Sequence, residues 1–124
     1  MDIREYKALM ESSATIRYVY FIKKVADYGE IWGLYDDGWT TTRDDNERVL
    51  IPFWPKKEFA EGCAVGEWSN YIATSINLEE FIKEWLPGMQ EDSVLASVFW
   101  NGDDSIAREA NKLLYDLEIE LEKY

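Results

Sequence analysis

The sequence predicts an α+β fold, with helices packed on a mostly antiparallel sheet of about four to five strands. Apolar residues recur at helical spacing in several separate stretches. Between these stretches lie short runs rich in β-branched and aromatic residues, bounded by polar turns. Apolar residues make up 47% and aromatic residues 15% of the 124 positions, which is enough material for one core. We therefore expect residues 1–124 to form a single domain.

The first part of the chain is expected to hold two helices and an antiparallel meander. Apolar residues have helical spacing over residues 3–10 and again over residues 14–25, and Gly29 suits the left-handed position that ends a helix. The runs "EIWGLY", "WTTT" and "RVLIPF" favour three strands, because threonine, tryptophan and branched residues suit a pleated surface. The short turns "DDG" and "RDDNE" between them predict a meander.

The segment "RVLIPFWPKKEFAEGCAVGEW" could display its aromatics at a binding site or bury them at a corner between a strand and a helix. Pro52 cannot donate to a strand ladder, so it is expected at the end of a strand or at a bulge. Pro55 suits the first position of a helix, and apolar residues follow at helical spacing. We interpret the segment as a corner that buries Phe53 or Trp54 and makes Cys63 a small core residue.

The second half begins with a predicted strand at residues 71–76. Asn77 is a good N-cap for an amphipathic helix over residues 78–86, which Pro87-Gly88 is expected to stop. "SVLASVFW" reads as a buried strand and "NGDD" as a turn. Ser105 is expected to cap a last helix that runs to the C-terminus. The predicted core contains Phe21, Val25, Leu50, Phe81, Trp85, Val98 and Leu114.

The charge of the chain restricts its partners. Thirteen basic and twenty-five acidic residues give a formal net charge of −12, which argues against binding to nucleic acid or to an anionic membrane. The N-terminus has no apolar stretch typical of a secretory signal, and no apolar run approaches the length of a membrane span. We expect a cytoplasmic protein.

Nothing in the sequence supports an enzyme. The chain has no histidine, which removes the usual bases of nucleophilic catalysis and the commonest metal ligand. Its one cysteine, Cys63, has no basic neighbour in sequence, and zinc sites of cysteine and histidine are excluded. The run Asp44–Glu47 lacks the spacing of a calcium loop. We therefore expect no catalytic residue, no metal and no cofactor.

Three segments resemble the bacterial family catalogued as domain of unknown function 2750. They are "RYVYFIKKVADYGEIWGLYDDGW", "IPFWPKKEFAEGCAVGEW" and "INLEEFIKEWLPGMQEDSVLASVF". The similarity spans residues 17–99 and continues in the helix that leads to "EIELEKY". It departs from the family pattern at Phe99-Trp100, where the family strand ends in Phe-Pro. The resemblance implies a small α+β domain and brings no catalytic residues with it.

Two functions remain open. The first is a protein-interaction module that neutralises or regulates a basic protein partner, with exposed aromatics as anchors and acidic turns as a rim. The alternative is a small-molecule-binding or enzymatic domain with an aromatic and carboxylate pocket between sheet and helices. The sequence does not indicate the oligomeric state. The candidate partner-binding residues are Trp32, Asp36, Asp37, Trp39, Asp44, Asp45, Trp100, Asp103, Asp104, Glu118 and Glu122.

Overall fold

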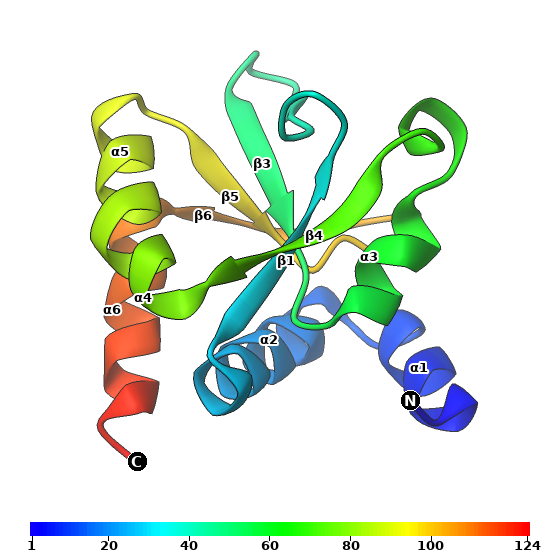
Figure 1. Ribbon diagram of the computed structural model, residues 1–124, viewed down its shortest axis with the longest axis horizontal. Coiled ribbons are helices and arrows are strands. Elements are labelled where there is room, and N and C mark those ends of the chain that lie inside the picture. The colour runs from blue at the N-terminus through cyan, green and yellow to red at the C-terminus, as the bar shows by residue number, and fades with distance from the viewer.

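The computed structural model describes residues 1–124 and contains two sheets surrounded by helices (Figure 1). In chain order the elements are α1 (Ile3–Met10), α2 (Ala14–Tyr28), β1 (Glu30–Tyr35), β2 (Thr42–Arg43), β3 (Val49–Phe53), α3 (Lys57–Cys63), η1 (Gly66–Trp68), β4 (Ile72–Asn77), α4 (Leu78–Glu80), η2 (Phe81–Trp85), α5 (Leu86–Glu91), β5 (Leu95–Val98), β6 (Ile106–Glu109) and α6 (Ala110–Leu121). The predicted α+β class is confirmed.

The larger sheet has the order β2-β3-β5-β6, and the smaller one pairs β1 with β4. Most neighbours are antiparallel, but β3 and β5 run parallel, so the sheet is mixed. Trp32 and Trp54 join the two sheets by exchanging backbone hydrogen bonds of 2.9 and 2.8 Å. In Figure 1, α4, α5 and α6 lie to the left of the strands, α2 below them and α3 to the right.

The predicted meander is wrong. β1 pairs with β4 along its whole length. Trp54 covers part of the other edge of β1, so the segment after β1 does not pair there as an adjacent strand. The expected second strand shrinks to a bridge between Tyr35 and Trp39 and the two residues of β2. The Trp39 ring packs against Gly33, with ring atoms 3.0 Å from where a Cβ would lie, so a larger residue there would require the ring to shift.

Local signals for the helices are largely confirmed. Gly29 ends α2 in the left-handed conformation with φ 72°. The side chain of Asn77 accepts hydrogen bonds from the backbone of Glu79 and Glu80 at the start of α4. The strand-to-helix corner is confirmed too, since Phe53, Trp54 and Cys63 are buried. Pro55 lies two residues before α3, instead of opening it.

Pro87 and Gly88 do not stop the helix, which continues to Glu91. The preceding segment η2 is a wider π-helical turn, in which the Leu86 amide bonds to the carbonyl of Phe81. Pro87 lies in the first turn that follows, where a missing N–H is tolerated. The extra residue in this turn also shifts the buried face from Phe81 to Leu86, and Trp85 is only half-buried as a result.

Ser105 does not cap the last helix. Residues 106–109 form β6 instead, paired with β5 at the edge of the larger sheet, and α6 begins at Ala110. A β-strand fits here because Ile106 and Arg108 point to one face and Ala107 and Glu109 to the other, an alternation that a helix-period pattern hides.

One cluster of 21 buried residues forms the core and draws on elements from α2 to α6. Of the predicted core residues, Phe21, Val25, Phe81 and Val98 belong to it. Trp85 and Leu114 are half-buried and pack against its surface. Leu50 is buried outside this cluster, on the other face of the larger sheet.

Arg17 is the one buried charged side chain, with 1% of its surface exposed. Its Nε donates to the carbonyl of Phe99 at 2.9 Å, and its other nitrogens donate to the carbonyls of Ser12 and Asp104 and to the Asp104 carboxylate. The guanidinium therefore ties the start of α2 to the loop that follows β5, with its donors satisfied.

Replacing Arg17 with methionine is expected to lower the free energy of unfolding by about 3 kcal/mol, because several buried carbonyls lose their donor. Chemical denaturation measures this change. The matched variant Arg4→Met removes an exposed arginine from α1 and should change stability by less than about 0.5 kcal/mol. Equal effects of the two substitutions would contradict the anchoring role of Arg17.

Burial raises the pKa of the Cys63 thiol to about 11, and the thiol donates to the carbonyl of Trp100 at 3.3 Å. A pKa raised by folding means that the contribution to stability is complete below the unfolded value and is lost as the pH rises towards the folded value. Stability should therefore fall between about pH 9 and pH 11, and less so in Cys63→Ser, whose hydroxyl does not titrate there. Denaturation of both proteins at about pH 8 and pH 10.5 tests this. A wild type and a serine variant that lose equal stability at the higher pH would refute it.

Candidate partner-binding site

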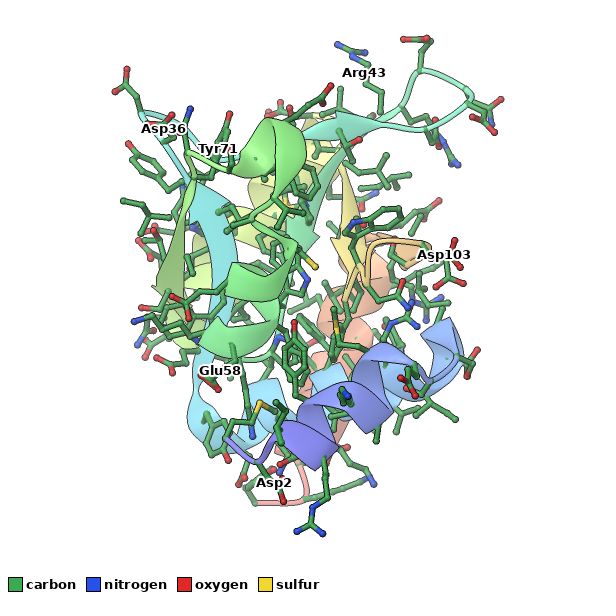
Figure 2. The ribbon with its side chains drawn as sticks, turned by 90° about the vertical axis from the view of Figure 1, so that its right-hand side faces the viewer. Asp2, Asp36, Arg43, Glu58, Tyr71 and Asp103 are labelled. Atoms are coloured by element: carbon green, nitrogen blue, oxygen red, sulfur yellow. The ribbon has the colours of Figure 1, made fainter.

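The outer edge of β4 is an unpaired strand edge. The amide of Leu78 bonds to the carbonyl of Gly29 at 2.9 Å, which fixes the alternation of the β1–β4 ladder. Thr74 and Ile76 therefore direct their backbone groups to β1, while Ala73 and Ser75 direct theirs away from it. In Figure 2, β4 is the outermost strand at the left, below the label of Tyr71, with β1 beside it.

This edge has none of the usual features that prevent pairing with another chain. The strand reads "IATSIN" and contains no charged residue, no proline and no glycine. Exposed edges normally carry such residues because free N–H and C=O groups attract other strands. β6, at the far edge of the other sheet, carries Arg108 and Glu109. The β4 edge is therefore suited to accept an extended segment.

Apolar surface and carboxylates meet at the Ile72 end of this edge. Ile72 is 71% exposed and lies opposite Tyr35, which is 41% exposed, on one face of the ribbon. Asp36 and Asp37 follow directly and are both exposed. Trp32 lies opposite Ser75 on the other face and is half-buried. The predicted residues Trp32, Asp36 and Asp37 thus lie together beside β4.

A groove of about 490 Å³ begins at the other end of the strand, at Asn77. Leu78, Ile82 and Leu121 supply its apolar lining, and Glu79, Lys83 and Glu118 its charges. Lys83 hydrogen-bonds to Glu79 at 2.7 Å, which lowers the pKa of that carboxyl. Glu118 has no ion-pair partner, so it is the free carboxylate of the groove.

The chain around β4 is strongly acidic. Between Glu58 and Ala107 it holds ten acidic residues and one basic residue, Lys83, which is already paired with Glu79. The acidic residues are Glu58, Glu61, Glu67, Glu79, Glu80, Glu84, Glu91, Asp92, Asp103 and Asp104. The uncharged strand β4 therefore lies within an acidic stretch of the sequence.

Lysines from two sequence pairs, Lys23-Lys24 and Lys56-Lys57, lie close together. Lys24 and Lys56 both lie over the rings of Tyr20 and Tyr28, at 5.4 to 5.8 Å from the ring centroids. Lys56 also lies 3.8 Å from the Glu5 carboxylate. Lys56 and Lys57 also line a hollow together with Trp32, Glu30 and Glu58, so these lysines border the β1 side of the ribbon.

The other predicted site residues lie apart from β4. Trp39 packs edge to face against Trp85 and Tyr35, with both pairs of ring centroids 5.1 Å apart. Asp104 is held by Arg17, and Asp103 next to it is exposed. Glu122 is exposed at the end of α6.

Asp44 and Trp100 line a second pocket, on the larger sheet. The Asp44 carboxylate accepts from the Arg48 side chain at 2.6 Å and from the backbone of Asn46 and Arg48, and the backbone bond from Arg48 contributes most to the lowered pKa of Asp44. Asp45 is exposed in the same loop.

Sequence reasoning missed Ala73, Ser75 and Glu79. The meander prediction gave β1 the wrong neighbour, so the edge position of β4 was not visible. The signal that could have found it is compositional, because β4 is an uncharged six-residue strand in an otherwise acidic stretch.

A family model described as "Protein of unknown function (DUF2750)" matches residues 18–117, which include β4 and most of α6 but stop short of Glu118 and Leu121 in the groove. The chain belongs to the DUF2750 family. Comparison of this DUF2750 chain with curated proteins and with solved structures finds no match. None of its helices combines the length and the apolar composition needed to cross a bilayer. No three of its cysteine and carboxylate side chains come together as potential metal ligands.

Amide hydrogen exchange tests the free edge directly. We expect the amides of Ala73 and Ser75 to exchange much faster than those of Thr74 and Ile76, because only the latter pair bonds to β1. Residue-resolved exchange measured by NMR reports all four amides in one experiment. Equal protection of the four would show that β4 is covered on both sides.

Proposed function

We propose that this domain is a protein-interaction module that binds an extended segment of a basic protein partner along β4. The observation that carries the proposal is the free and uncharged edge of β4 within an acidic part of the chain. Strand addition of this kind uses backbone hydrogen bonds for affinity and neighbouring side chains for specificity.

Ala73 and Ser75 each offer one N–H and one C=O to an added strand, so they can form four backbone hydrogen bonds. These bonds do not depend on the sequence of the partner. Ile72 and the half-buried Trp32 flank them on opposite faces of the ribbon and offer apolar contacts to alternate side chains of the partner. The strand edge thus provides affinity through backbone hydrogen bonds, and the side chains provide part of the specificity.

Charge supplies the rest of the specificity. Basic side chains before and after the added strand would meet Asp36 and Asp37 at one end and Glu118 in the groove at the other. The net charge of −12 also attracts a cationic partner from a distance and disfavours acidic competitors. Binding would mask positive charge on the partner, which is a means of neutralising or regulating it.

We place this activity in the cytoplasm. The one cysteine, Cys63, is buried as a free thiol, and the chain has no disulfide to require an oxidising compartment.

A defined peptide tests the proposal. The probe is a labelled peptide with an alternating Thr-Val core and a lysine pair at each end, and its twin carries glutamate pairs instead. We expect the basic probe to bind and Ser75→Pro to weaken binding about tenfold, because proline removes a hydrogen-bond donor from the free edge. Ser75→Pro should stay folded, since that N–H does not bond to β1. Fluorescence anisotropy measures binding, and circular dichroism checks the fold.

Variants that remove charge separate the electrostatic contribution to binding from the contribution of strand addition. Asp36→Asn with Asp37→Asn should weaken the basic probe and flatten its salt dependence. The matched control, Glu11→Gln with Asp27→Asn, removes the same charge from the C-cap of α1 and from α2 and should leave the salt slope nearly unchanged. A folded Ser75→Pro variant with unaltered affinity, or binding of the acidic twin as tight as that of the basic probe, would overturn the proposal.

A further inference from the structure

A second pocket of about 360 Å³ lies on the larger sheet, away from β4. Each of the four strands gives it one residue from the same face, and these residues are Thr42, Leu50, Ser97 and Ala107. Trp68 from η1 and Trp100 after β5 add its aromatic lining, and Arg43, Asp44 and Ser105 complete it. Figure 2 shows the loops of Arg43 and Asp103 projecting on one side of the molecule, and the pocket is built between these loops and the sheet.

Buried groups hold both tryptophans in place. The indole N–H of Trp54 donates to the carbonyl of Trp100 at 2.9 Å, and Cys63 donates to the same carbonyl. The ring of Trp54, itself fully buried, packs edge to face against Trp68 with centroids 6.3 Å apart. The pocket is therefore preorganised, and forming a complex costs little ordering of its side chains.

This pocket offers several free hydrogen-bond donors. Neither Trp68 nor Trp100 donates its indole N–H to a protein acceptor. Ser97 is buried, and its hydroxyl lies 2.7 Å from that of Ser105, so one of the two hydroxyl protons remains free.

The guanidinium of Arg43 adds further donors to the pocket. Arg43 uses one guanidinium nitrogen on the carbonyl of Glu47 and keeps its other N–H groups. The Asp44 carboxylate accepts three hydrogen bonds, from Arg48 and Asn46, and its charge is paired with that of Arg48.

We infer that this pocket binds a small planar aromatic carboxylate. Tryptophan rings favour a flat apolar ring, and a volume of about 360 Å³ suits a molecule of one or two fused rings. The free indole N–H groups can donate to acceptors on the ligand, and the guanidinium of Arg43 is suited to a carboxylate. The inference is independent of partner binding, because no residue of the pocket belongs to β4 or to the groove beside it.

The probes that test it are indole-3-carboxylate and the neutral indole-3-carboxamide. Both should shift the indole N–H signals of Trp68 and Trp100 in NMR spectra of the whole protein. The carboxylate should bind about fivefold more tightly, and Arg43→Gln should abolish that preference. Ala107→Leu fills the pocket from an exposed position of β6 and should abolish binding of both probes, whereas Ala107→Ser should retain it.

Thermal denaturation confirms that each variant is folded. The inference is overturned if neither probe shifts the two indole signals, or if a folded Ala107→Leu variant binds as the wild type does. It is also overturned if the carboxamide binds as tightly as the carboxylate. Retention of basic-peptide binding by Ala107→Leu would show that the two sites fail independently.

Discussion

The buried guanidinium of Arg17 is the contact on which much of the architecture depends. It joins the turn between α1 and α2 to the end of β5 through backbone carbonyls, so it fixes two chain segments that no sheet connects. Phe99 has a positive φ of 58° at this point, and the bond from Arg17 to its carbonyl holds that unusual conformation. Trp100 is the next residue, so the hydrogen bond from Arg17 in α2 also helps to position Trp100 beside the larger sheet.

The second constraint is the sharing of β1 between two neighbours. Trp32 bonds to Trp54 on one side, and the whole strand bonds to β4 on the other. The Trp39 ring packs against Gly33. Both edges of β1 therefore have partners, and β4 is left as the outer member of the pair. The surface that we assign to partner binding is a consequence of this arrangement.

Elements could be predicted from the sequence where the signal was local. Gly29 at the end of α2 and Asn77 at the start of α4 act through their own backbone neighbourhood, so their roles were visible without the fold. Pairing was not predictable in this way, because β1 meets β4 across more than thirty intervening residues. The same limit applies to the candidate site. Asp36 was a candidate from composition, whereas Ser75 matters only because β4 lies at an edge.

The π-helical turn at η2 gives one continuous helix two different directions of contact. Up to Phe81 the helix points into the sheet, where the rings of Phe81 and Phe53 meet edge to face at 4.9 Å. Beyond the turn its phase is offset, and Leu86 and Met89 become the inward positions. The residues before and after the turn therefore bury different faces of the helix. Deleting a single residue within it would restore an unbroken α-helical phase, and one of its two faces would then have to turn away from the core.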